Sequence, residues 1–184
     1  MRMMKGLMRL SGGVHAGAVA LVLGLFWWAK GLMDAAYAAS QHPVDYFRGQ
    51  TGFSAERIRG YHAVMQDAGT LDIYVCSQML DFGFIASFFL LGLVLSSFVA
   101  RFAAGESFAR RLALRAGFFV MAAAVFDVTE NLISLIMLEN PQGFAAWLAL
   151  PYSGAAVVKF GLLAAGTVGL VGALLAIAVQ RLRA

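Results

Sequence analysis

Two carboxylic acids lie three residues apart inside an otherwise apolar stretch, in the segment FDVTENLIS that spans residues 126–134. Positions three and four apart share one face of an α-helix, so Asp127 and Glu130 lie on the same face, which Asn131 and Ser134 continue. Charged groups are costly in a hydrocarbon environment and therefore mark candidate functional sites. This segment has the clearest potential for chemistry in the chain.

Polar residues with the same helical spacing occur in two further apolar segments. They are Tyr74, Ser77, Gln78 and Asp81 in one segment, and Tyr152 and Lys159 in another. Three acids, Asp81, Asp127 and Glu130, would then face one base, Lys159, with Lys30 as a further candidate. Three acids beside one base cannot all ionise in a site of low dielectric constant, so at least one carboxyl should stay protonated near neutral pH. Such a group can act as a general acid, a proton carrier or a buried hydrogen-bond donor.

The sequence leaves two interpretations of these polar residues open. In the first, they bind a lipid-like or amine-bearing ligand: Asp81 and the Asp127/Glu130 pair contact its polar part, and Lys159 orients the acids. In the second, the same residues form a structural salt-bridge network that holds the helices in register. Neither interpretation assigns a catalytic residue.

Known catalytic and metal-binding motifs are absent from the sequence. It contains no Walker loop and no GxGxxG, HExxH, CxxC or DDxxD motif. The single cysteine, Cys76, excludes an internal disulfide and a cysteine-rich zinc site. His15 is expected to be a packed residue, and His42 and His62 lack the spacing of metal ligands. A divalent ion held by the paired acids is disfavoured by the neighbouring lysine. We therefore predict neither a metal nor another cofactor.

The composition is that of a membrane protein. Hydrophobic residues make up 61% of the chain and charged residues 13%, against about 45–50% and about 25% in soluble domains. Four apolar runs are each long enough to cross a hydrocarbon core of about 30 Å. A secretory signal is the rival interpretation of the first run, but that run exceeds the usual signal core of about 7–15 residues. We predict one all-α integral membrane domain, 1–184, a bundle of four transmembrane helices with spans near residues 10–33, 72–100, 112–138 and 152–180.

The long loop 34–70 is predicted to contain a short amphipathic helix over residues 54–68. Ser54 is a suitable N-cap and Gly69 a suitable stop for this helix. Its apolar stripe consists of Ile58, Tyr61 and Met65. Its position beside the polar residues makes it a candidate lid.

Proline and small residues predict how the spans begin and pack. Pro151 is expected to separate a short interfacial helix at 144–150 from the fourth span, because one helix over 144–180 would be about 55 Å long. Small residues on the spans should let helix backbones approach closely. They are Gly13, Gly17, Gly92, Ser96, Ala165, Gly169, Gly172 and Ala176.

The distribution of charge predicts the topology. The N-terminus, the linker between the second and third spans and the C-terminus carry nine basic residues against one acid, Glu106. The basic residues are Arg2, Lys5, Arg9, Arg101, Arg110, Arg111, Arg115, Arg181 and Arg183. The positive-inside rule then places both termini in the cytoplasm and the long loop outside, in the inner (plasma) membrane of the cell. The net charge of +4 therefore reports topology and does not indicate nucleic-acid binding.

The topology also predicts the depth of each charge. At 1.5 Å per residue from the last cytoplasmic arginine of each helix, Lys30, Asp81 and Lys159 lie about 30–33 Å away. The carboxylates of Asp127 and Glu130 lie about 18 and 22 Å from theirs. All four helices would thus bring charge to the outer half, which predicts a polar funnel that opens outward beneath the loop helix.

One group of known proteins carries a similar arrangement. The order FSAERIRGYHAVMQDAGTLDIYVCSQMLDFGFIASF, then FDVTENL, then a lysine early in the last span resembles a family of small bacterial four-helix membrane proteins. That family has an aspartate in helix two and a D-x-x-E-N motif in helix three, and the resemblance covers about residues 50–165. It implies the architecture and marks five residues without assigning them an activity: Asp81, Asp127, Glu130, Asn131 and Lys159.

Three functional hypotheses follow from these observations. The first is a non-enzymatic protein that binds a ligand or serves as an accessory subunit, because no catalytic constellation is recognisable. The second is an integral membrane enzyme that acts on a lipid or isoprenoid by acid–base chemistry. The third is a proton-coupled transporter, for which four spans would be few unless the protein forms a homo-oligomer. Expected partners are membrane lipids and a membrane protein partner or second copy.

Overall fold

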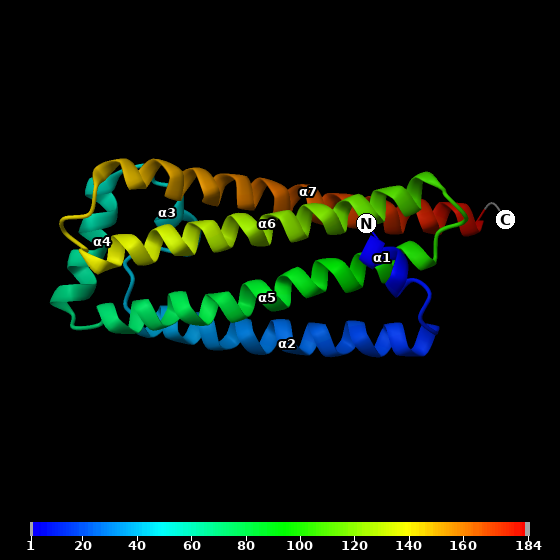
Figure 1. Cartoon of the computed structure of the whole chain (residues 1–184), viewed down its shortest axis with the longest axis horizontal. Helices are drawn as coiled ribbons and strands as arrows, with labels where there is room; N and C mark the ends of the chain where they lie inside the picture. The colour runs from blue at the N-terminus through cyan, green and yellow to red at the C-terminus, as the bar shows by residue number, and fades with distance from the viewer. Residues whose placement is uncertain (1, 183–184) are drawn as a thin grey trace. The chain divides into compact units, whose positions relative to one another are not determined.

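The computed structural model of the chain describes residues 2–182. Every regular element among these residues is a helix. The four long helices are α2 (Gly12–Ala39), α5 (Leu71–Arg101), α6 (Phe108–Glu139) and α7 (Ala149–Leu182) (Figure 1). The short elements are α1 (Arg2–Leu7), α3 (Tyr46–Gln50), α4 (Ala55–Asp67) and the 3₁₀-helix η1 (Ala146–Leu148).

The four long helices are long and apolar enough to cross a membrane. Many large apolar side chains on them also point outward, which is costly in water but favourable in lipid. Examples are Leu21, Trp27, Trp28, Leu150, Val168 and Leu175, each at least 64% exposed. The prediction of an all-helical protein with four candidate membrane spans is confirmed.

The boundaries of two predicted spans need correction. The first was expected to end near residue 33, but α2 continues to Ala39. The prediction that Pro151 separates two helices is wrong: α7 begins at Ala149 and runs through Pro151 without a break. Pro151 is the third residue of α7, where a backbone N–H has no acceptor within the helix, so the missing proline N–H costs little there.

The chain divides into two compact units, and each long helix contributes one segment to each unit. The first unit comprises Met1–Phe26, Ala86–Ala124 and Phe160–Ala184, and the second comprises Trp27–Ile85 and Val125–Lys159. Of the ten acids in the sequence, nine belong to the second unit and Glu106 alone to the first.

The core of the first unit consists of small and aliphatic side chains. One cluster joins Met4 of α1 to residues of α5, α6 and α7, and a second joins Val19 and Val22 of α2 to Val94 of α5. His15 is fully buried, and its Nε2 lies 3.1 Å from the Val94 carbonyl oxygen. The prediction that His15 is a packed residue is therefore confirmed.

Small residues create the close helix contacts of the first unit. A Cβ atom added to Gly92 would lie 2.6 Å from Val120, and one added to Gly169 would lie 3.2 Å from Ala116. The predicted role of small residues in packing is thus confirmed on α5 and α7. It is wrong on α2, because a Cβ on Gly13 or Gly17 would meet no atom within 4 Å.

In the second unit, α4 packs through the apolar stripe expected from the sequence. Ile58 and Met65 are buried in two separate clusters, which also contain residues of α5, α6 and α7. The Ser54 side chain caps α4 by accepting a hydrogen bond from the Arg57 backbone N–H, and Gly69 follows the helix with a φ of 68°. The predicted helix and its capping residues are confirmed.

Candidate functional site

Lys159 is the centre of a buried polar cluster in the second unit. Its ammonium donates hydrogen bonds to Asp127 Oδ1 at 2.9 Å, to Glu130 Oε2 at 2.5 Å and to Gln50 Oε1 at 3.0 Å. An ammonium has three N–H donors, so three acceptors match its hydrogen-bonding capacity. We call the set Gln50, Asp81, Asp127, Glu130, Asn131 and Lys159 the polar cluster.

These charged side chains are almost completely withdrawn from solvent. The exposed fraction is 6% for Lys159, 9% for Asp127 and 1% for Glu130. Removal of charges from water costs several kcal/mol per ion, and only well-placed partners offset that cost. The three side chains therefore depend on one another.

Asp81 occupies a different position in the polar cluster. Its Oδ2 accepts a hydrogen bond of 2.8 Å from the amide of Asn131, a neutral donor. Asp127 lies close enough to Asp81 for the two charges to repel each other. Measured over the whole residue, backbone included, Asp81 and Asp127 are 7% and 6% exposed, whereas Glu130 and Asn131 are fully buried. Asp81 and Asp127 thus retain slightly more exposed surface than Glu130.

The polar cluster has fewer positive charges than carboxyl groups and fewer hydrogen-bond donors than acceptors. Among its described residues, three carboxyl groups face one ammonium, a formal charge of −2 if all ionise. Two buried acceptor atoms, Glu130 Oε1 and Asn131 Oδ1, have no hydrogen-bond partner in the described part of the chain. Buried polar atoms in folded proteins nearly always have partners, so these two atoms require an explanation.

The helical spacing seen in the sequence explains how the cluster assembles. Asp127, Glu130 and Asn131 occupy adjacent positions on one face of α6, and Asp81 lies on α5. The structure brings together five of the eight residues proposed from the sequence: Asp81, Asp127, Glu130, Asn131 and Lys159.

The other three proposed residues are buried on the same faces but have different contacts. Tyr74 hydrogen bonds with Ser134 and with Tyr152 of α7. Gln78 is buried one turn before Asp81 on α5. They extend the buried polar surface of α5 and α6 beyond the polar cluster.

Lys30, the other candidate base, lies outside the polar cluster. Its ammonium pairs with Asp34 at 2.5 Å, four residues later on α2. Both side chains are more than one-third exposed. In the described structure Lys30 therefore makes its ion pair with Asp34 and not with the three acids.

Aromatic and histidine side chains form a second group in the same unit, which we call the tyrosine cluster. Its members are Tyr37, His42, Tyr46, Tyr61, His62 and Tyr74. The Tyr37 and Tyr46 ring centroids are 3.9 Å apart, and the Tyr37 hydroxyl donates to the Val44 carbonyl at 2.7 Å. The Tyr46 hydroxyl donates to Asp34 at 3.3 Å. All five tyrosines of the sequence belong to the second unit.

Burial disfavours the charged form of the histidines in this cluster. It lowers the pKa of His42, which the carbonyl of Val44 partly offsets, and it lowers the pKa of His62, which the carbonyl of Pro141 partly offsets. Burial also raises the pKa of Tyr46. In the residues that the structure describes, no three His, Cys, Asp or Glu side chains are placed to hold a metal ion.

Sequence reasoning missed the contribution of the loop to the site. Gln50, the last residue of α3, reaches Lys159 from a segment without helical periodicity. Three residues later, Phe53 has a φ of 50°, and its backbone N–H donates to Ser153 Oγ at 3.0 Å. A left-handed conformation is unusual for an aromatic residue and needs outside support, which Ser153 supplies. In the sequence, Gly52 next to Phe53 was the feature that could have indicated an unusual backbone conformation in this loop.

The fold and the site define the class: an all-helical chain with four candidate membrane-spanning helices and a buried carboxylate–lysine cluster. No described protein family matches this sequence, and no curated protein or solved structure matches it.

Proposed function

We propose that this chain is a membrane-embedded binding protein whose polar cluster takes a ligand with a positively charged amine. The observation that carries the proposal is the charge deficit of the cluster: three buried carboxyl groups face one ammonium. A ligand amine would supply both the missing charge and the missing donors. In the same proposal, both termini are cytoplasmic, the protein lies in the plasma membrane and α4 faces outward.

The ligand amine would bind between Asp81 and Asp127. These two acids retain a little exposed surface, and the hydrogen bond of Asp81 comes from a neutral amide. A primary ammonium has three donors, and the unpartnered Asn131 Oδ1 supplies a third acceptor beside the two carboxyls. Lys159 would hold Asp127 and Glu130 in place, as a positioning residue.

The tyrosine cluster suits the same chemistry. Tyrosine ring faces attract cations, and aromatic cages bind substituted ammonium groups. Asp81 acts electrostatically on Tyr46, so the two clusters are near neighbours within the second unit. The apolar surroundings of the helices favour a ligand with a hydrocarbon part, such as an amphiphile that enters from the bilayer.

Bound protons are a second way to close the charge deficit. The closeness of Asp81 to Asp127 favours it, because two neighbouring carboxyls can share a proton. Asp81 would then act as a general acid on a lipid or as a proton carrier. Unlike an amine site, such a site would gain no stability from an added amine.

The proposed function can be tested with a simple amine in place of the unknown ligand. Thermal unfolding of the purified protein would be measured with dodecylamine and, as a neutral match, with dodecanol. We expect dodecylamine to raise the melting temperature and dodecanol to leave it unchanged. Asp81→Asn should weaken dodecylamine binding at least about tenfold, because a hydrogen bond to a charged group is lost.

The matched control for this test is Asp72→Asn, which makes the same substitution at an exposed position in the first turn of α5. It should bind dodecylamine as well as the native chain does. Equal stabilisation by amine and alcohol, or an equal loss in the two variants, would overturn the proposal of an amine site.

A further inference from the structure

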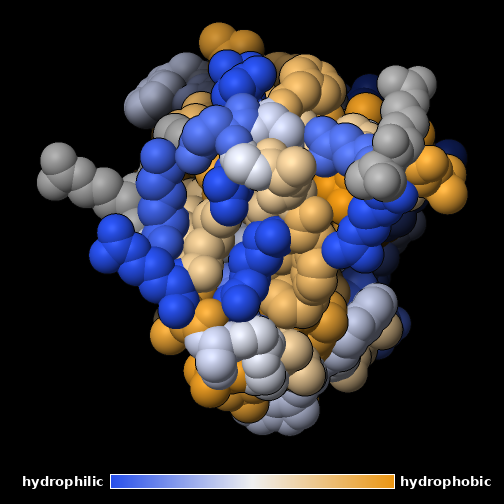
Figure 2. All heavy atoms as spheres, turned by 90° about the vertical axis from the view of Figure 1, so that its right-hand side faces the viewer, coloured by the Kyte–Doolittle hydropathy of each residue, from blue (hydrophilic) through white to orange (hydrophobic). Residues whose placement is uncertain are grey.

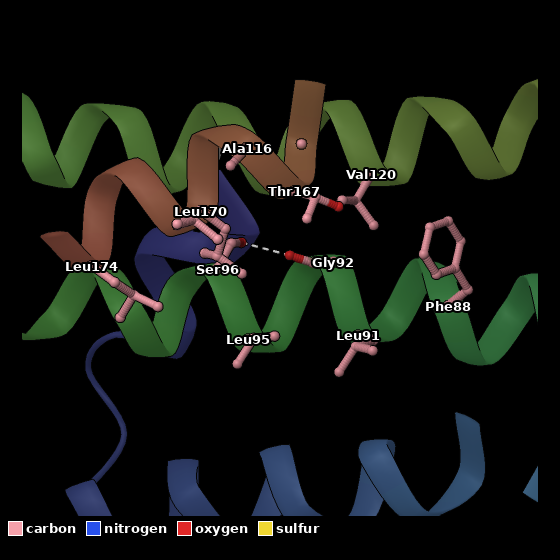
Figure 3. Close-up of a pocket in the computed structure, with 13 residues that line it drawn as sticks. Phe88, Leu91, Gly92, Leu95, Ser96, Ala116, Val120, Thr167, Leu170 and Leu174 are labelled. Carbon is pink, nitrogen blue, oxygen red and sulfur yellow. Dashed lines mark hydrogen bonds between the residues drawn. The ribbon is translucent and has the colours of Figure 1, made fainter. Parts of the chain in front are cut away.

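The first unit contains an apolar cavity of about 200 Å³ between α5, α6 and α7 (Figure 3). Phe88, Leu91 and Leu95 line it from α5, Val120 from α6, and Leu170 from α7. The cavity is larger than a cavity of about 150 Å³ that stays dry and binds benzene in another protein. It would therefore accept a hydrocarbon group.

The Ser96 hydroxyl in the wall of the cavity needs no partner from a ligand. Ser96 Oγ already donates to the Gly92 carbonyl at 2.5 Å, which Figure 3 marks with a dashed line. An apolar occupant would therefore leave the Ser96 hydroxyl with its hydrogen-bond partner. The side chains that line the cavity therefore favour a hydrocarbon group as its occupant.

The shape of the cavity favours a chain over a compact ligand. Its lining runs from Phe88 to Ser96 on α5 and from Gly166 to Leu174 on α7, which is about 12 Å along each helix at 1.5 Å per residue. A slot of this kind parallel to spanning helices suits one acyl chain.

The glycines around the cavity argue against a second helix as the occupant. A Cβ on Gly117 would clash with Ser96 Oγ, and a Cβ on Gly166 would lie 2.7 Å from Val120. These small residues are already used for packing within the unit, so they do not offer the flat surface that pairs of membrane helices use.

A second hollow shares one lining residue with the slot and contains a positively charged side chain. Leu174 lines both, and the second hollow is also lined by Phe102, Ile177 and Arg181. The guanidinium carbon of Arg181 lies 5.5 Å from the centre of the Phe102 ring. Among the described residues, the salt bridges of the chain do not include Arg181.

The charge of this end of the first unit matches an anionic headgroup. Its described residues include seven basic side chains against the one acid Glu106: Lys5, Arg9, Arg101, Arg110, Arg111, Arg115 and Arg181. Figure 2 shows several strongly hydrophilic side chains, in blue, spread over this face among hydrophobic residues. Basic pockets beside spanning helices attract anionic lipids.

We propose that an anionic phospholipid of the bilayer binds the first unit, with one acyl chain in the slot and its phosphate at Arg181. The site is distinct from the polar cluster, which lies in the second unit and is short of positive charge. The two sites therefore select headgroups of opposite charge.

Native mass spectrometry of the protein from nanodiscs with equal parts phosphatidylglycerol and phosphatidylcholine tests the headgroup. We expect the native chain to retain phosphatidylglycerol preferentially, and Arg181→Gln to lower that preference about fivefold, the effect expected for one basic residue near a membrane surface. The control is Arg111→Gln, which removes the same charge from the same unit outside the slot, where Arg111 donates to the Glu106 carbonyl. Equal effects of the two variants would overturn the headgroup site.

The proposed acyl-chain site is tested by placing a large side chain in the slot. Thr167 lines the cavity, whereas its neighbour Val168 is 71% exposed and does not. Thr167→Phe should reduce retention of both lipids at least about fourfold, the value of one methylene lost from an apolar site, and Val168→Phe should leave retention unchanged. Equal lipid retention by the two variants, or a change of oligomeric state in place of lipid loss, would refute an acyl chain in the slot.

Discussion

Replacement of Lys159 by methionine is the most direct test of the polar cluster. The substitution keeps a long unbranched side chain but removes the ammonium that three acceptors contact at 2.5–3.0 Å. Asp127 and Glu130 would then remain buried without their cation. Breaking a buried ion pair in this way costs about 3–5 kcal/mol, and the near-complete burial of all three side chains leaves no solvent screening to reduce that figure.

The assay is thermal unfolding of the purified protein at pH 7. A loss of about 3–5 kcal/mol in a chain of this size corresponds to a fall in melting temperature of roughly 6–20 °C. The double variant Lys159→Met with Glu130→Gln should recover part of the loss, because one uncompensated carboxylate is removed. A coupling free energy of about 0.5–3 kcal/mol between the two positions is expected.

Lys30→Met is the matched control. It makes the same substitution in an ion pair whose side chains are 36% and 43% exposed, and such pairs contribute about 0–1 kcal/mol. If Lys159→Met and Lys30→Met lower the melting temperature equally, the three acids do not depend on Lys159 and the reasoning about the polar cluster is wrong.

Three further predictions concern packing, pH and the loop. Gly117→Ala should lower the free energy of unfolding by about 1–3 kcal/mol, because its Cβ would clash with the Ser96 hydroxyl. Gly17→Ala should raise the free energy of unfolding by about 0.5–1 kcal/mol, because a Cβ there has nothing within 4 Å. Equal melting temperatures of the two variants would contradict this prediction. Burial lowers the pKa of His62, so the stability that depends on this residue should be constant above about pH 6.5 and fall on acidification below it, because the unfolded chain then binds the proton more readily. In melting curves from pH 7.5 to pH 5, His62→Gln should be less affected than the native chain. Ser153→Ala removes the acceptor of the Phe53 N–H and should lower the stability of the loop by about 1 kcal/mol. The loss should be measurable as faster hydrogen exchange in the loop, and unchanged exchange would count against that contact.

The elements and faces of this protein could be predicted from its sequence because they depend on local rules. Helical spacing placed Asp127, Glu130 and Asn131 on one face, and capping chemistry defined the ends of α4 at Ser54 and Gly69. These signals need only neighbouring residues, so a single sequence contains them.

The parts that could not be predicted depend on contacts between distant segments. Gln50 lies 109 positions from Lys159 in the chain, and no periodicity marks a five-residue helix such as α3. Pro151 was misinterpreted for a related reason: its cost depends on its place within the helix, and that place was set by η1 and the loop before it.

Asp81→Asn separates the two interpretations of the polar cluster, the structural network and the ligand site. The uncharged side chain of this variant has the same length and shape as that of Asp81 and would still offer an amide oxygen to Asn131, so the 2.8 Å hydrogen bond can persist while the charge beside Asp127 disappears. If Asp81 served only the network, relief of this repulsion would raise stability and nothing would be lost. If Asp81 binds an amine, the ligand-free variant should melt at a higher temperature than the native chain and yet lose its response to dodecylamine. Such a gain of stability with a loss of binding is the trade-off known from functional sites that hold unfavourable charges. A variant that melts lower without ligand would contradict both interpretations, because it would mean that the Asp81 charge stabilises the cluster.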